Sequence, residues 1–149
     1  MQKENFKLTG LRLNKKTFNA GGQAMADCGG LWQRFMGEGI ANKISGKISG
    51  NLYAVYFDYD GNHTNPYSFF IGCKVDTNAV VPEGLQSVSI PTQNYTVISA
   101  KGKMPDCVAA TWEDIWKSDI NRAYGYDFEE YTILRPDWSA QVDIYISVK

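Results

Sequence analysis

Hydrophobic and polar residues alternate with a period of two over residues 6–18, with a change of phase at Gly10. This period is typical of a half-buried β-strand. Residues 52–59 are mostly hydrophobic and aromatic and precede an Asp-Gly-Asn turn signal, which indicates a hairpin. Gly, Pro and polar residues separate the other strand-like stretches. The predicted strands span residues 6–18, 52–59, 67–75, 87–99, 126–134 and 142–148, and Pro91 is expected to break the stretch 87–99.

Two further stretches, residues 26–36 and 105–117, repeat their large apolar residues with the period of an α-helix. Asp27 is the expected N-cap of the first helix. Pro105 suits the first turn of the second helix because its missing N–H would have no partner there. The apolar faces consist of Leu31, Trp32, Phe35 and Met36 in the first helix and of Val108, Trp112, Ile115 and Trp116 in the second.

The order of strand, helix, strand and strand occurs twice along the chain. Residues 25–28, Met-Ala-Asp-Cys, recur as Met-Pro-Asp-Cys at 104–107, near the start of a predicted helix each time. Repeats share a supersecondary unit, and each half-sheet needs a partner to bury its apolar face. We therefore predict one α+β domain over residues 1–149, with two β-α-β-β halves at about 5–76 and 85–149. Pseudo-two-fold symmetry, helices packed on an antiparallel sheet and a central ligand pocket are expected.

Composition restricts the functional classes. The chain has 149 residues, 44% hydrophobic and 21% charged, which suits one globular domain. The net charge of −1 argues against a nucleic-acid-binding protein. Neither a secretory signal nor a membrane-spanning run is evident, so we expect a cytoplasmic protein. Three cysteines without a Cys-x-x-Cys pair give no reason to expect a disulfide, metal or cofactor site.

Aromatic residues make up 13% of the chain. Rings carry much of the burial energy of any hydrophobic core, and they also line pockets for flat or cationic ligands. Composition alone leaves both interpretations open. Two other residues have side chains that could take part in catalysis, but a simpler role is expected for each. His63 is expected in an exposed hairpin loop, and Cys73 is expected to pack within a strand.

The segment 126–131 places two carboxylates on a predicted strand. Alternation puts Glu129 and Tyr131 on one face and Phe128 and Glu130 on the other. One acid therefore points inward whichever face is buried. A buried carboxylate beside aromatic rings is costly unless a cation or hydrogen-bond donors offset its desolvation. An edge strand with both acids in water is the alternative, and spacing alone does not decide between them.

These features together resemble a known family. The order of elements, a Trp on each helix, the Phe-Glu-x-Tyr pattern at 128–131 and the terminal stretch 142–149 are similar to the GyrI-like small-molecule-binding domain. That domain is also the effector-binding part of AraC-type and MerR-type multidrug-responsive regulators. The resemblance extends over nearly the whole chain. No helix-turn-helix precedes the first predicted strand, so a stand-alone form is expected.

The resemblance implies that Glu129 lies in a central pocket and pairs with cationic ligands. Tyr131 shares its face and is expected to shape the pocket. Asp58 after Phe57 loosely mirrors Glu129 after Phe128, and its place in the pocket is left open. Aromatic walls are expected from Trp32, Trp112, Trp116, Tyr53 and Tyr145.

The expected function is binding of small, hydrophobic, cationic aromatic molecules, with no direct contact to nucleic acid or membrane. One alternative is a hydrolase that uses Glu129 as general base and Tyr131 as hydrogen-bond donor. It is less favoured because no second catalytic group is recognisable. The other alternative is a gyrase-inhibitor-like protein-interaction module. A homodimer formed through a sheet edge is left open.

Overall fold

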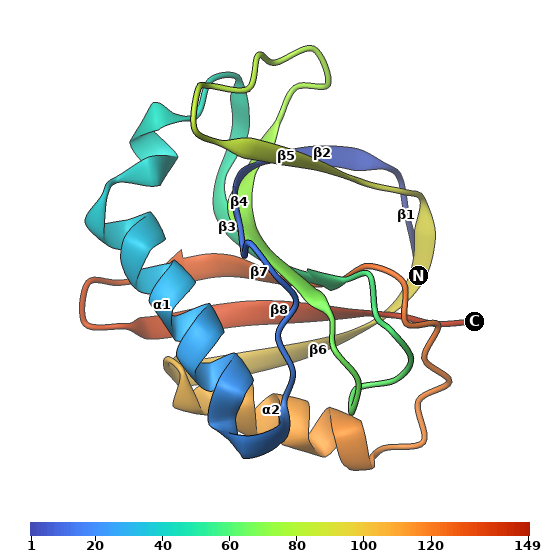
Figure 1. The fold of residues 1–149 in the computed structure, drawn as a ribbon. Coiled ribbons are helices and arrows are strands. Elements are labelled where there is room, and N and C mark those ends of the chain that lie inside the picture. Colours follow the sequence, from blue (N-terminus) through green and yellow to red (C-terminus); the bar gives the residue numbers. More distant parts are fainter.

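One antiparallel sheet of eight strands carries two α-helices (Figure 1). The computed structural model describes residues 1–149. This architecture confirms the predicted α+β class. The strands are β1 (Gln2–Lys3), β2 (Phe6–Arg12), β3 (Lys47–Phe57), β4 (Ser68–Val75), β5 (Gln86–Ile90), β6 (Gln93–Lys103), β7 (Asp127–Leu134) and β8 (Ser139–Ser147). The helices are α1 (Gln23–Gly37) and α2 (Asp106–Lys117), with short 3₁₀ turns at η1 (Ala20–Gly22) and η2 (Ile40–Lys43).

The strand order is β1-β6-β8-β7-β3-β4-β2-β5, with β3 and β7 at the centre. Outward from this pair, β4 and β2 follow on one side and β8 and β6 on the other. Along the chain, one side is formed by β2, α1, β3 and β4 and the other by β6, α2, β7 and β8. Both sides therefore have the order strand, helix, strand, strand. Two repeated halves would produce this order, and the duplication itself stays a prediction.

Both helices lie on the same face of the sheet, while the sheet curls around its other face (Figure 1). The core under the helices contains 20 buried residues, including Phe35 of α1 and Ile115 of α2. A second cluster of 10 buried residues fills the curled face. There the ring of Phe6 on β2 meets that of Phe128 on β7 edge-on, with centroids 5.4 Å apart. The middle of the sheet, where β3 and β7 pair, is therefore buried on both faces.

Several element boundaries differ from the sequence-based expectation. Strand β2 ends at Arg12, and only Thr17 returns to the sheet, in an isolated bridge to Tyr67. Helix α1 begins at Gln23, so Asp27 is inside the helix and is not its N-cap. Its carboxylate accepts hydrogen bonds from the Thr17 hydroxyl and the Gln23 amide instead.

The stretch 87–99 is broken at Pro91, as predicted, and belongs to two separate strands. Strand β5 ends before Pro91 and β6 begins after it, because proline has no N–H for a sheet ladder. No helix in the structure is long and apolar enough to cross a membrane.

Candidate functional site

A cavity of about 350 Å³ lies between α1 and α2, over the central strands β3 and β7. Its volume falls in the range of small-molecule sites, about 300–1,000 Å³. The predicted hairpin loop after β3 supplies another part of its wall. Most of its lining residues are hydrophobic. The aromatic rings in the wall belong to Trp32, Tyr56, Tyr59, Tyr67, Trp112, Trp116 and Tyr131.

Glu129 on β7 is a buried acidic group at the base of this cavity, and only 1% of the residue is exposed. The Tyr56 hydroxyl donates a hydrogen bond of 2.8 Å to Oε2, and the Trp112 Nε1–H donates one of 2.6 Å to the same oxygen. The Tyr131 hydroxyl donates to Oε1 at 2.6 Å. These three donors are neutral, and none of the ion pairs in the structure includes Glu129.

Burial and hydrogen bonding act on the Glu129 carboxyl in opposite directions. Desolvation raises the pKa of Glu129, and the hydrogen bonds from Tyr131, Trp112 and Tyr56 oppose that rise. The donors favour the ionised form without cancelling its charge. The site can therefore hold a proton or place a negative charge against a cation in the cavity.

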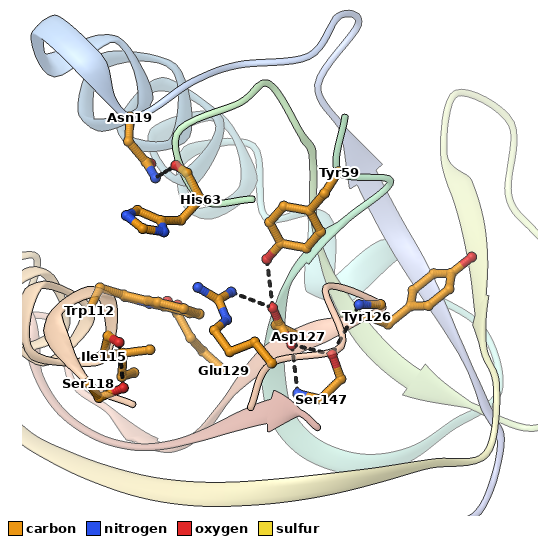
Figure 2. A network of polar contacts seen from close by, with 12 residues as sticks. Asn19, Tyr59, His63, Trp112, Ile115, Ser118, Tyr126, Asp127, Glu129 and Ser147 are labelled. Carbon is orange, nitrogen blue, oxygen red and sulfur yellow. Dashed lines mark hydrogen bonds and ion pairs between the residues drawn. The ribbon is translucent and has the colours of Figure 1, made fainter. Parts of the chain in front are cut away.

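A second buried carboxylate, Asp127, lies two residues before Glu129 on the same face of β7. Its Oδ2 accepts hydrogen bonds from Arg122 Nη2 at 2.8 Å and from the Tyr59 hydroxyl at 2.7 Å. Its Oδ1 accepts from the backbone N–H and the hydroxyl of Ser147, both at 2.7 Å. Figure 2 shows Tyr59 and Ser147 converging on Asp127. Both Asp127 oxygens are thus fully satisfied by the chain itself.

Sequence reasoning missed both Asp127 and Arg122. Arg122 lies in the segment between α2 and β7 and lines the cavity. The period of two did place Asp127 on the face of Glu129, so that signal was available. No comparable signal existed for Arg122, because irregular segments carry no periodicity.

Most of the predicted site residues meet in the cavity: Glu129, Tyr131, Trp32, Trp112 and Trp116 all line it. Trp32 of α1 also packs edge-on against Tyr131, with ring centroids 5.0 Å apart. The two helices therefore contribute Trp side chains from opposite sides of the site.

The two predicted strand tyrosines, Tyr53 and Tyr145, lie elsewhere. Both belong to the buried cluster on the curled face of the sheet, so their assignment to the pocket is wrong. Tyr53 pairs with Glu130 and Tyr145 pairs with Phe128 in the ladder. Paired residues point to the same face of a sheet, and Glu130 and Phe128 point away from the cavity.

The structure also corrects the expected exposure of His63. It lies in the loop after β3, as predicted, but its side chain lines the cavity and stacks on Trp116, with centroids 5.6 Å apart. The Asn19 side chain donates a hydrogen bond to its backbone carbonyl at 2.7 Å (Figure 2), which ties the loop to the segment before α1. Desolvation lowers the pKa of His63, and the nearby Arg122 charge lowers it further.

Asp58 and Cys73 have no part in the cavity. Asp58 is exposed and forms ion pairs with Lys16 at 3.6 Å and Arg12 at 3.9 Å. Cys73 is buried in the core under the helices, which confirms its predicted packing role. No group of three or more His, Cys, Asp or Glu residues is placed to hold a metal ion.

Comparison with known proteins identifies the family of this chain. Residues 1–148 match the model of Cass2, described as an integron-associated effector binding protein. The chain belongs to the Cass2 family. The crystal structure of the integron cassette protein Cass2 of Vibrio cholerae aligns with a TM-score of 0.74 and 26% identity, covering 100% of this chain and 94% of that one. The resemblance to GyrI-like effector-binding domains is thereby confirmed.

Two other proteins extend the comparison of this Cass2-family chain. The structure of SAV2435 bound to tetraphenylphosphonium aligns with a TM-score of 0.75 and 21% identity, covering 100% of this chain and 92% of that one. YobU of Bacillus subtilis (strain 168), named as a transcriptional regulator, is 27% identical over 124 residues, or 80% of this chain and 75% of YobU. The first shows a shared fold, and the second shows similarity to regulator-like proteins.

Proposed function

We propose that this Cass2-family protein binds small hydrophobic cations in the cavity between α1 and α2, with Glu129 as the partner of the positive charge. The observation that carries the proposal is a buried carboxylate that faces an aromatic cavity and has no cation of its own. A buried charge without a countercharge is costly, and a cation from outside would offset that cost.

The walls of the cavity favour the same class of ligand. Trp32, Trp112 and Trp116 line it, and Trp is the strongest cation–π partner among the side chains. Each desolvated cation–π contact contributes about 2 kcal/mol, and the apolar wall favours hydrophobic substituents around the charge. A small, strongly hydrated cation would gain less, because it would lose its water shell.

The comparisons support this proposal. The Cass2 family is described by effector binding. SAV2435, which shares the fold, has been seen with tetraphenylphosphonium, a cation surrounded by phenyl rings. The same chemistry suits a cavity built from aromatic side chains and a buried carboxylate.

The test is titration of the wild-type protein and Glu129→Gln with tetraphenylphosphonium by isothermal calorimetry. The variant keeps the shape of the side chain and removes its charge. We expect its affinity to fall roughly 30-fold, about 2 kcal/mol, as for two unit charges about 8 Å apart at an effective dielectric constant near 20, because the phenyl rings keep the phosphorus away from the carboxylate. Quenching of Trp fluorescence gives an independent readout, because three Trp residues line the cavity.

Glu130→Gln is the matched control. Glu130 is the next residue of β7 but points to the other face, where it accepts hydrogen bonds from Asn51 and Tyr53. The affinity of Glu130→Gln for tetraphenylphosphonium should stay within about twofold of the wild type, since a charge on the far side of the sheet lies outside the cavity. Equal affinities for wild type and a folded Glu129→Gln would overturn the proposal.

A further inference from the structure

Arg122 has hydrogen-bonding capacity that the chain does not use. Its side chain is only 5% exposed, and its Nη2 bonds Asp127. Its Nε and Nη1 are buried and have no hydrogen-bond partner. Folded proteins leave few buried donors unpaired, because each one costs about as much as a lost hydrogen bond. Arg122 also lines the cavity, so it borders the space that a ligand would occupy.

The surroundings of the guanidinium consist of aromatic rings. Its Cζ lies 4.3 Å from the ring centroid of Tyr124, 5.7 Å from that of Trp112 and 5.9 Å from that of Tyr59. Rings hold the flat group in place, but they do not satisfy N–H donors as an oxygen does. The Nδ1 atom of His63, which also lines the cavity, is buried and unpartnered as well. In Figure 2 the His63 side chain lies above Trp112, with Tyr59 and Asp127 beside them.

Asp127 neutralises Arg122 without occupying these donors. Each of its oxygens already accepts two hydrogen bonds, and only one of them comes from Arg122. The pair therefore has little net charge, and its arginine still has unused N–H groups at the wall of the cavity. Such a group binds an oxygen acceptor of a ligand, either a carbonyl or a carboxylate.

We propose that the cavity has a second polar end, at which Arg122 donates to an oxygen acceptor on the ligand, with His63 beside it. This inference rests on the proposed function and adds to it the class of cation preferred: a hydrophobic cation that also carries a carbonyl or carboxylate oxygen. Trp112 separates the two ends. Its Nε1–H bonds Glu129 at 2.6 Å, while its ring lies beside Arg122. The cation and the acceptor must therefore lie at different ends of one aromatic body.

Three dyes with the same cationic ring system test this. Tetramethylrosamine has no oxygen acceptor on its phenyl ring, tetramethylrhodamine methyl ester has an ester, and tetramethylrhodamine has a free carboxylate. Fluorescence anisotropy gives the dissociation constant of each dye. For the wild type we expect at least one acceptor dye to bind about tenfold more tightly than the rosamine, as one charge-assisted hydrogen bond would give. If both acceptor dyes bind more tightly than the rosamine, the preferred acceptor is a carbonyl oxygen. If only the dye with the free carboxylate binds more tightly, the preferred acceptor is an anion.

Arg122→Lys links the preference to its residue. Lys keeps a positive charge opposite Asp127 but cannot present the planar fork of donors. The ratio of affinities between acceptor dye and rosamine should therefore fall toward one. A ratio of one or less in the wild type overturns the inference, and this measurement does not depend on how the variant folds. An unchanged ratio in a folded Arg122→Lys also overturns it.

The outcomes separate this inference from the proposed function. If the rosamine fails to bind, or binds Glu129→Gln equally well, the proposed function is wrong. If the rosamine binds in a Glu129-dependent way and the acceptor dyes gain nothing, only the role of Arg122 is wrong.

Discussion

Asp127 and Glu129 are two buried carboxylates on one face of one strand, yet the chain treats them differently. Asp127 is fully buried and receives a cation, Arg122, together with donors from Tyr59 and Ser147. Glu129 is 1% exposed and receives three neutral donors. The chain therefore supplies a countercharge for Asp127 and none for Glu129.

The different surroundings of the two carboxylates show how one strand can carry both a stabilising residue and a ligand-binding residue. A carboxylate with its own arginine and a full set of donors ties loop, strand and terminus together, and it has nothing left to offer a ligand. A carboxylate with donors but no cation stays positioned while its charge remains uncompensated. We interpret Asp127 as a structural residue and Glu129 as the binding residue on this basis.

The largest effect should come from removing the countercharge of Arg122. Asp127→Asn leaves Arg122 buried without its countercharge, and we expect the free energy of unfolding to fall by about 3–5 kcal/mol. Urea denaturation followed by circular dichroism measures this change. Asp143→Asn is the control, because Asp143 accepts only an exposed hydrogen bond from Ser99. Equal stability of the two variants would contradict the comparison.

A smaller effect should appear when pH changes the charge of Glu129. Burial raises the pKa of Glu129, so the carboxyl is protonated below that value and cannot pair with a cation. Affinity for tetraphenylphosphonium should rise by up to about tenfold per pH unit as pH increases toward the raised pKa, and then level off. Calorimetry over a pH series in two buffers also detects the proton released on binding.

The same shift in pKa sets the sign of the stability change. The native state holds the Glu129 proton to higher pH than the unfolded chain, so this residue favours folding most below its unfolded pKa of about 4.3. That contribution is lost as pH rises through the folded pKa. Glu129→Gln should remove both pH dependences, and His63→Gln controls for the imidazole that also lines the cavity. A pH-independent affinity in the wild type would refute this prediction.

The smallest effect should come from the opposite face of the sheet. Tyr53→Phe removes the hydrogen bond to Glu130 and should cost about 1 kcal/mol of stability, with affinity for tetraphenylphosphonium unchanged. Tyr56→Phe, on the cavity face, removes a donor of Glu129 and should weaken binding. Thermal unfolding and titration of both variants make the comparison. A loss of affinity in Tyr53→Phe alone would show that the two faces are coupled.

Much of this molecule follows from local patterns in its sequence. The period of two over 126–131 put Glu129 and Tyr131 on one face, and the apolar faces of both helices contained Trp32 and Trp112. Those patterns also gave the order of elements and the resemblance to the family. They succeed because side-chain direction within a strand or helix depends only on the local backbone.

The tertiary structure decided which of these faces meet and what closes over them. Register between strands far apart in the sequence placed Tyr53 and Tyr145 on the curled side of the sheet, although each belongs to a correctly predicted strand. Irregular segments carried His63 and Arg122 into the cavity. Periodicity fixes relative directions inside one element, whereas pairing register and loop paths depend on long-range contacts that no local pattern records.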